Sequence, residues 1–321
     1  CRKAIDAGYH VLLEIPIAQI LAECIDIAEH AKRKGVLVCV CHVLRYHPYF
    51  RKIKEVVDSG ELGKIISISH IASVGLDRTT HGFVRGLWRK EKLTNPMLIA
   101  KCCHDVDLLL WLTKTPCRRL SSFGSLRWFR SENAPEGSSE RCIDCSVETE
   151  CPYSAVDLYY NRRSWISNFD IPAGKTLDDV LMEELRHGMY GRCVFHCDND
   201  VVDHQVLSME MADKVTINLS MDIFTNDDCR ETHIKLTHGE IDGNEKHLRV
   251  RKFRSNEEQV FDFSDISNKP FHAGADLNLV DHFVKALSSK EYELQTSIEN
   301  SVESHRICYE AERSRLTGQI V

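Results

Sequence analysis

Three cysteines close together in the sequence carry the pattern with the most specific chemistry. Cys142, Cys145 and Cys151 follow one another with two and five intervening residues in a polar loop. Thiolates two residues apart are typical of zinc sites, but a closed structural site takes four ligands and no fourth is adjacent in sequence. The residues that could complete the set in space are Cys193, His196 and Cys197. The alternative is that the three are free thiols that pack the loop.

Two other segments, residues 80–89 and 190–193, combine hydrogen-bond donors with aromatic residues. Sugars and polyols are bound by fixed donors with an aromatic face nearby. The candidate substrate-binding residues on this ground are His81, Arg85, Trp88, Tyr190 and Arg192. For each of them, a role in packing or in an ion pair is the alternative.

The first 42 residues predict a strand, a helix and a second strand. Short apolar runs at 9–14 and 36–41 are typical of buried parallel strands, and apolar residues recur at helical spacing over 18–34. Gly35 ends this helix, because glycine adopts the left-handed conformation without steric cost. Two strands joined by a helix form a βαβ unit with parallel strands, which is half of a doubly wound domain.

Ligands of such sheets bind outside the carboxyl ends of the strands. We therefore expect a binding crevice beside the residues that follow each predicted strand. These are Glu14, Ile15 and Pro16 after the first strand and residues 42–46, which include His42 and Arg45, after the second.

The rest of the chain predicts a larger α+β unit. A helix at 47–59, an alternating strand at 64–73 and a helix at 105–112 come first. Strand-like runs without crossover helices follow, which favours a large, mainly antiparallel open sheet. These runs lie at 119–126, 201–209, 215–223, 232–236 and 248–253. Residues 130–200 are polar and interrupted by proline, which predicts a long functional loop, and helices at 276–287 and 298–316 close the chain.

Composition argues against several classes of function. A formal charge of −7 and a pI near 6.2 disfavour nucleic acid or an anionic membrane as partner, because both require a concentrated basic surface. Every apolar stretch is far shorter than the ~20 residues that span a bilayer, and the residues after Cys1 do not resemble a signal peptide. Fourteen cysteines spread over 321 residues favour reduced thiols. We expect a cytoplasmic α/β protein.

Four sets of residues combine in a characteristic order and spacing. They are residues 7–16 (AGYHVLLEIP), 45–48 (RYHP) with 58–63 (DSGELG), 274–276 (GAD) and 311–318 (AERSRLTG). Together they resemble the Gfo/Idh/MocA family of oxidoreductases over nearly the whole chain.

The resemblance implies an N-terminal Rossmann domain that binds NAD or NADP, and a second domain whose open sheet faces the nicotinamide and mediates homo-oligomer formation. The implied parts are 1–42 (C-terminal part of the Rossmann domain), 43–296 (substrate and oligomerisation domain) and 297–321 (a helix near the Rossmann part). The cofactor-binding candidates are then Glu14, Ile15, Pro16, His42 and Arg45. The family's glycine-rich phosphate loop would precede Cys1, so we expect an N-terminally incomplete chain that binds dinucleotide weakly or not at all.

The resemblance also implies a proton carrier beside the carbon that exchanges hydride, which the family associates with the lysine of Glu-Lys-Pro and with a histidine. His104 and Asp107 match the family pattern Asp-x-Gly-x-His-x-x-Asp, while Ala100 and Cys102 depart from it. His104 is therefore the catalytic candidate and Asp107 a candidate for substrate binding. The alternative is that His104 only caps the following helix.

Ile15 occupies the position of the family's lysine, and an isoleucine has no proton to exchange. Lys101 could supply the ammonium as a second catalytic residue, or be a solvated lysine at a helix start. Two further hypotheses stay open: the chain is a non-catalytic relative, or Ile15 is an isolated change in an active lineage.

The expected function is NAD(P)-dependent hydride transfer to or from a small sugar, polyol or similar hydroxy compound. The alternatives are an NAD-dependent glycosidase of the same family and an inactive subunit that binds or supports a partner.

Overall fold

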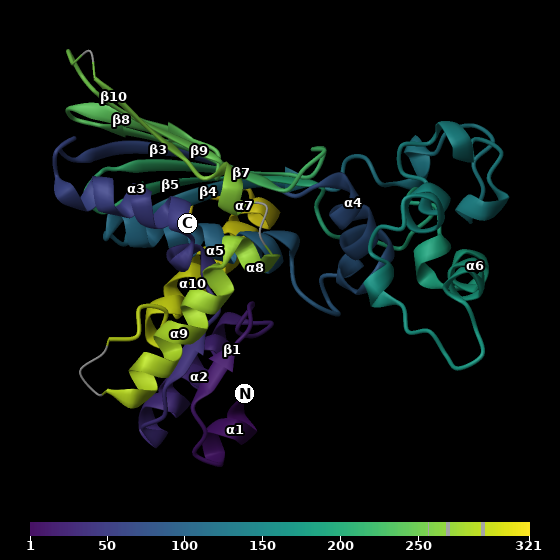
Figure 1. The fold of residues 1–321 in the computed structure, drawn as a ribbon, viewed down its shortest axis with the longest axis horizontal. Coiled ribbons are helices and arrows are strands. Elements are labelled where there is room, and N and C mark those ends of the chain that lie inside the picture. The colour runs from purple at the N-terminus through teal and green to yellow at the C-terminus, as the bar shows by residue number, and fades with distance from the viewer. Residues whose placement is uncertain (256, 268–269, 290–292) are drawn as a thin grey trace.

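The computed structural model describes residues 1–255, 257–267, 270–289 and 293–321. Figure 1 shows a small N-terminal unit, a large sheet covered by helices on one face, and a separate lobe to the side. The helices are α1 (Arg2–Asp6), α2 (Leu21–Lys34), α3 (Pro48–Ser59), α4 (Leu76–Thr79), α5 (Met97–Thr113), α6 (Leu177–His187), α7 (Ser264–Ser267), α8 (Pro270–Ala273), α9 (Ala275–Ser288) and α10 (Ile298–Thr317). The strands are β1 (Val11–Leu13), β2 (Val38–Val40), β3 (Ile65–Ser73), β4 (Cys117–Ser125), β5 (His204–Met211), β6 (Thr216–Asp222), β7 (Cys229–Leu236), β8 (Gly239–Gly243), β9 (His247–Lys252) and β10 (Glu258–Asp262).

The N-terminal unit is the predicted βαβ arrangement. β1 and β2 pair in parallel, with Val11 opposite Val38 and Leu13 opposite Val40. α2 connects them and ends at Gly35, whose φ of 64° is left-handed. The buried face of this unit packs against the start of α10, so the last helix of the chain lies beside the first strands.

The large sheet has the strand order β10-β9-β8-β7-β3-β6-β5-β4. Its neighbours are antiparallel except for β3 and β6, which confirms the mainly antiparallel prediction. β8 and β10 were not predicted, because β8 begins and ends with glycine and β10 is a polar edge strand with little burial. α3, α5 and α10 cover one face of the sheet, and the other face is open.

The prediction of one long loop over residues 130–200 is wrong. These residues form α6 and several short helical turns around an apolar core of their own, which includes Leu158, Leu181 and Leu185. A capping box between Thr176 and Asp179 starts α6. We call this part, which Figure 1 shows to the side of the sheet, the lobe.

α5 is longer than predicted, because it begins at Met97 rather than at residue 105. Its residues are buried on nearly every side, so the sequence has no polar face to mark the helical period. His104 therefore lies in the middle of the helix, and the alternative that it caps a helix start is wrong.

A buried ion pair joins α5 to the end of β2. Arg45 Nε and Nη2 donate to the two carboxylate oxygens of Asp107 at 2.6 and 2.7 Å. Arg45 Nη1 donates to the carbonyl of Gln295 at 2.9 Å. The Asp107 side chain is 1% exposed, so this pair ties three separate segments together in the interior.

The Asp107→Ala replacement would leave the Arg45 guanidinium buried without a counter-charge. We expect the free energy of unfolding, measured by urea denaturation, to fall by about 3–5 kcal/mol. The double variant Arg45→Met/Asp107→Leu should recover most of that loss, because no charge is then left unpaired. Glu303→Ala, which removes the more exposed pair with Arg306, serves as control and should cost less than about 1 kcal/mol. A comparably small loss for Asp107→Ala would contradict the role of the buried pair.

Candidate active site

A narrow cavity of about 160 Å³ lies where the end of β1 meets α5 and the centre of the large sheet. Its wall includes Ile15 from the turn after β1, Lys101 and His104 from α5, and Arg230 from β7. The other lining residues are Ala72, Ser73, Val74, Arg78, Ala100, Cys102, Asp105, Asp228 and His272.

A wider cavity of about 550 Å³ adjoins the narrow one, because both are lined by Ile15, Arg78, Ala100 and Lys101. We call the two together the cleft. The wider part extends toward the lobe, and its remaining lining residues are His81, Gly82, Phe83, Leu87, Trp88, Trp165 and Tyr190.

His104 reaches the narrow cavity while its Nδ1 is buried without a hydrogen-bond partner among the described residues. Its ring lies edge-on to that of His42, with centroids 5.6 Å apart. Burial, together with the nearby His42 and Arg230, holds the pKa of His104 well below its usual range. The imidazole is therefore neutral at pH 7 and able to accept a proton.

His305 on α10 holds the turn that carries Ile15. Its Nδ1 donates to the carbonyl of Ser301 at 3.0 Å, and its Nε2 accepts a hydrogen bond from the backbone of Ile17 at 3.1 Å. These two bonds require the neutral Nδ1–H tautomer, and burial lowers the pKa of His305 accordingly.

Lys101 faces the same two cavities as Ile15. Its Nζ lies 5.4 Å from the ring centre of Phe83 and makes no ion pair within the part of the chain that the structure describes. Burial, reinforced by Arg78 and Arg230, lowers the pKa of Lys101 to about 8, although Asp228 opposes the change. The alternative of an ordinary solvated lysine does not account for this environment.

Asp105 is a buried, charged residue that lines the narrow cavity. Its Oδ1 accepts hydrogen bonds from Arg230 Nε at 2.6 Å and from His70 Nε2 at 3.0 Å. Burial alone would raise the pKa of Asp105, but these two partners outweigh it and hold the pKa below its usual range. Its Oδ2 is buried without a hydrogen-bond partner among the described residues.

Aromatic rings form the wall of the wider cavity. The ring of His81 stacks between Trp165 and Tyr190, at centroid distances of 5.0 and 4.5 Å, and the Arg78 guanidinium lies 5.4 Å from the centre of Trp165. His81, Tyr190 and Trp88 were predicted. Trp165 was not, because it lies in the lobe without any sequence pattern that connects it to the others.

Four predicted ligand-binding residues make internal contacts instead and line neither part of the cleft. Arg85 is wholly buried and donates to the carbonyl of Arg192, which in turn donates to the carbonyl of Arg85 and pairs with Asp198. Arg45 and Asp107 pair with each other. All four link segments of the structure.

The other cofactor candidates lie around the end of β1. Glu14 is exposed at the end of the strand, Pro16 is half-buried beside Ile15, and His42 is completely buried behind His104.

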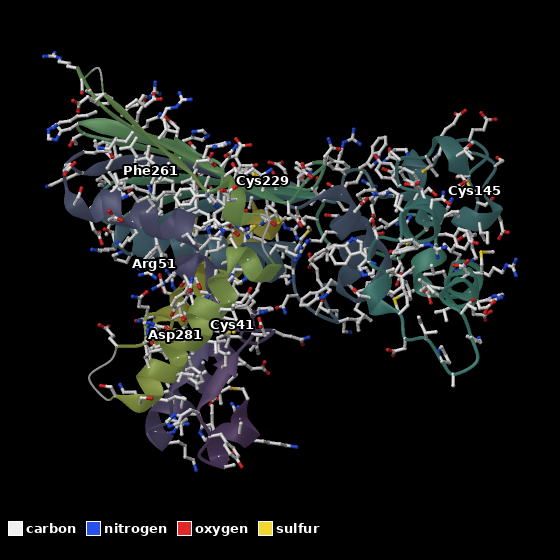
Figure 2. All side chains as sticks on the ribbon, in the orientation of Figure 1. Cys41, Arg51, Cys145, Cys229, Phe261 and Asp281 are labelled. Atoms are coloured by element: carbon white, nitrogen blue, oxygen red, sulfur yellow. The ribbon has the colours of Figure 1, made fainter. Side chains whose placement is uncertain are left out.

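The zinc prediction for the cysteine loop is not supported. Within residues 1–255, 257–267, 270–289 and 293–321, no three histidine, cysteine or acidic side chains are grouped so that they could hold a metal ion. Cys142 Sγ lies 3.7 Å from both Arg85 Nη2 and the carbonyl of Arg192, and every cysteine is free. Figure 2 shows Cys145 in the lobe, apart from Cys41 and Cys229.

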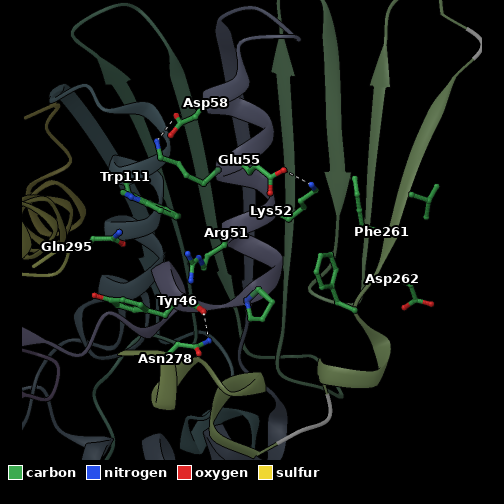
Figure 3. Close-up of a pocket in the computed structure, with 14 residues that line it drawn as sticks. Tyr46, Arg51, Lys52, Glu55, Asp58, Trp111, Phe261, Asp262, Asn278 and Gln295 are labelled. Carbon is green, nitrogen blue, oxygen red and sulfur yellow. Dashed lines mark hydrogen bonds and ion pairs between the residues drawn. The ribbon is translucent and has the colours of Figure 1, made fainter. Parts of the chain in front are cut away.

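A larger, open cavity of about 920 Å³ lies between α3, β10 and α9 (Figure 3). Several of its charged side chains are paired along α3, as in Lys52 with Glu55 and Lys54 with Asp58. It shares no lining residue with the cleft. In the described residues, no helix is both long enough and apolar enough to span a membrane.

The unusual pKa of Lys101 predicts a stabilising replacement. Because its folded pKa lies below the usual value of 10.5, the charged form costs stability at neutral pH. Lys101→Met should therefore raise the free energy of unfolding by about 1–3 kcal/mol at pH 7. That gain should shrink as pH rises through 8 toward 10.5, where the unfolded lysine also loses its charge. Lys92→Met, at an exposed site, should change stability by less than about 0.5 kcal/mol in the same urea titrations. A loss of stability for Lys101→Met would refute this description of its surroundings.

Comparisons with known proteins identify a shared domain and relatives among oxidoreductases. The GFO/IDH/MocA C-terminal domain matches residues 50–152. YteT of Bacillus subtilis, which is named as an oxidoreductase, is 22% identical over 314 residues, covering 92% of this chain and 72% of YteT.

Two solved structures share the fold over the entire chain. An oxidoreductase from Agrobacterium radiobacter in complex with NAD+, L-tartaric acid and magnesium has a TM-score of 0.68 at 12% identity, and 75% of it is covered. The aldose-aldose oxidoreductase from Caulobacter crescentus, complexed with glycerol, has a TM-score of 0.64 at 14% identity, with 74% covered. The matched domain, the relative that aligns along the chain and the shared fold all support a Gfo/Idh/MocA family oxidoreductase.

Proposed function

We propose that this chain provides the substrate site of an NAD(P)-dependent oxidoreductase that transfers hydride to or from a sugar, polyol or similar hydroxy compound. The observation that carries the proposal is the position of His104 and Lys101. They lie one turn apart on α5 and line one narrow cavity beside Ile15, at the carboxyl end of β1. A relative by fold that is named for aldoses, and another solved with NAD+, support the proposed chemistry.

The residues at this strand end fit the nicotinamide end of a dinucleotide. Ile15 offers apolar surface beside the cavity, and the buried atoms His104 Nδ1, His42 Nδ1 and Asp105 Oδ2 have no hydrogen-bond partners among the described residues. Ile15 and Pro16 would hold that end, while His42 packs behind His104. When bound, the cofactor supplies the acceptor or donor of hydride.

His104 moves the proton that accompanies the hydride. In the direction of oxidation, its neutral imidazole takes the proton of the substrate hydroxyl as the carbon–hydrogen bond breaks, and in reduction it returns that proton. The Lys101 ammonium donates a hydrogen bond to the same oxygen and stabilises the negative charge that develops on it.

The structure favours Lys101 as the replacement for the family's lysine. Ile15 stands where the family has its lysine and carries no charged group. Lys101, however, lines both of the cavities that Ile15 lines. Lys101 reaches the same space from α5, so an ammonium is still available to a substrate in the cleft. An ammonium in this position favours an active enzyme over a non-catalytic relative.

We also propose that two copies associate through the open face of the large sheet. Short polar side chains such as Ser69, Ser208 and Asn218 stand in neighbouring strands on this face, beside the exposed Phe123 and Val206. The short side chains leave room for close approach of a second sheet, and the exposed apolar residues gain by being covered.

His104→Asn should remove the proton carrier while keeping a side chain of similar size. With NAD or NADP added, we expect kcat for polyol oxidation to fall about 10²–10⁴-fold. The measurement is formation of reduced cofactor across a panel of sugars and polyols. His238→Asn, at an exposed position away from the cleft, is the control and should keep the parent rate. A rate near that of the parent for His104→Asn would refute its role.

Exchanging the lysine between the two positions tests the second catalytic group. Lys101→Met should lower kcat, and Ile15→Lys in that background should restore much of it, because an ammonium again reaches the cleft. Ile15→Lys alone should give little gain over the parent. A large gain from Ile15→Lys alone, with Lys101→Met unaffected, would show that Lys101 does not replace the missing group.

A further inference from the structure

Two cations, Arg78 and Lys101, line both parts of the cleft. Arg78 Nε donates to Asp228 Oδ2 at 2.7 Å, and its guanidinium lies over the ring of Trp165. These contacts hold the guanidinium in place at the junction of the two cavities.

The charges that line the cleft do not balance. Among the lining residues, Arg78, Lys101 and Arg230 are positive and Asp105 and Asp228 are negative, which leaves one positive charge; Glu245, which pairs with Arg230 at 3.6 Å, does not line the cleft. Asp105 already pairs with Arg230 at 2.6 Å and Asp228 with Arg78 at 2.7 Å. The Lys101 ammonium is thus the group without an anionic partner in the described part of the chain, and a partly buried charge in that condition is costly.

The size of the narrow cavity limits the group that could supply the missing charge. A volume of 160 Å³ corresponds to the space of about five water molecules in the liquid. A terminal carbinol carbon with an adjoining carboxylate has about that many heavy atoms. The planar guanidinium of Arg78 also suits the planar oxygens of a carboxylate.

We propose that the cleft selects sugar acids, whose carboxylate binds Lys101 and Arg78 in the narrow cavity while the hydroxylated chain or ring lies along the wall formed by Trp165, His81 and Tyr190. The proposal names the substrate class of the proposed function and rests on it for the redox step. Binding of the acid itself rests only on the cleft.

The test compares acids with neutral partners of the same carbon skeleton. Gluconate against glucitol, and glucuronate against glucose, are titrated into this chain calorimetrically at pH 7 and low salt, without cofactor. We expect at least one acid to bind about tenfold or more tightly than its neutral partner. Equal or tighter binding of both neutral compounds, or binding of neither acid, would overturn the proposal.

The Arg78→Gln variant tests whether the preference for acids arises at the proposed carboxylate site. The ratio of acid to neutral affinity should fall about tenfold in this variant. Arg163→Gln is a matched control, because Arg163 also pairs with an aspartate, Asp178 at 2.7 Å, and lies 4.8 Å from the ring of Tyr160, but it lines neither part of the cleft. The ratio in this control should equal that of the parent, and an unchanged ratio in Arg78→Gln would overturn the assigned site.

Two further arms separate the alternatives. Glucose 6-phosphate is titrated in the same way. If it binds more tightly than both acids, the cleft recognises a phosphate and not a carboxylate, and the proposed substrate class is overturned. Hydride transfer is measured separately with NAD or NADP added. Acid binding without turnover of any substrate would refute the proposed function and leave the present inference standing, whereas turnover of neutral polyols without acid preference would do the reverse.

Discussion

The buried pair between Arg45 and Asp107 is the interaction on which the geometry of the site depends. Arg45 follows β2, Asp107 lies on α5, and the guanidinium also binds the backbone just before α10. None of these segments can move away without leaving a charge unpaired in the interior. The pair therefore fixes the rotation of α5 against the ends of the parallel strands.

The orientation of α5 decides which of its polar side chains face the narrow cavity, the large sheet and Arg45. Residues three apart share a helix face, so Lys101 and His104 both reach the narrow cavity. Asp105, the next residue, meets His70 and Arg230 from the large sheet. Asp107 lies on the side of Arg45. Because α5 is buried nearly all round, Asp105 and Asp107 each meet a basic partner in the interior.

The site is completed by parts that lie far apart in the sequence. His305, near the end of the chain, holds the backbone of Ile17 near its beginning, and so positions the turn that carries Ile15. The lobe contributes Trp165 and Tyr190 to the aromatic wall. Burial keeps His104 and His305 neutral, because it lowers the pKa of both, which suits the first for accepting a proton and the second for holding the turn.

The sequence by itself determined the local elements. Short apolar runs and helix-ending glycines predicted the βαβ unit, and strand patterns without crossover helices predicted the antiparallel sheet, because these signals act between near neighbours. It also indicated His104, Lys101 and His81. Only the tertiary structure decided that Arg45 and Asp107 pair with each other, that Lys101 faces the same space as Ile15, and that residues 130–200 form a lobe with its own core. Those outcomes depend on contacts between distant segments, which neither periodicity nor residue type encodes.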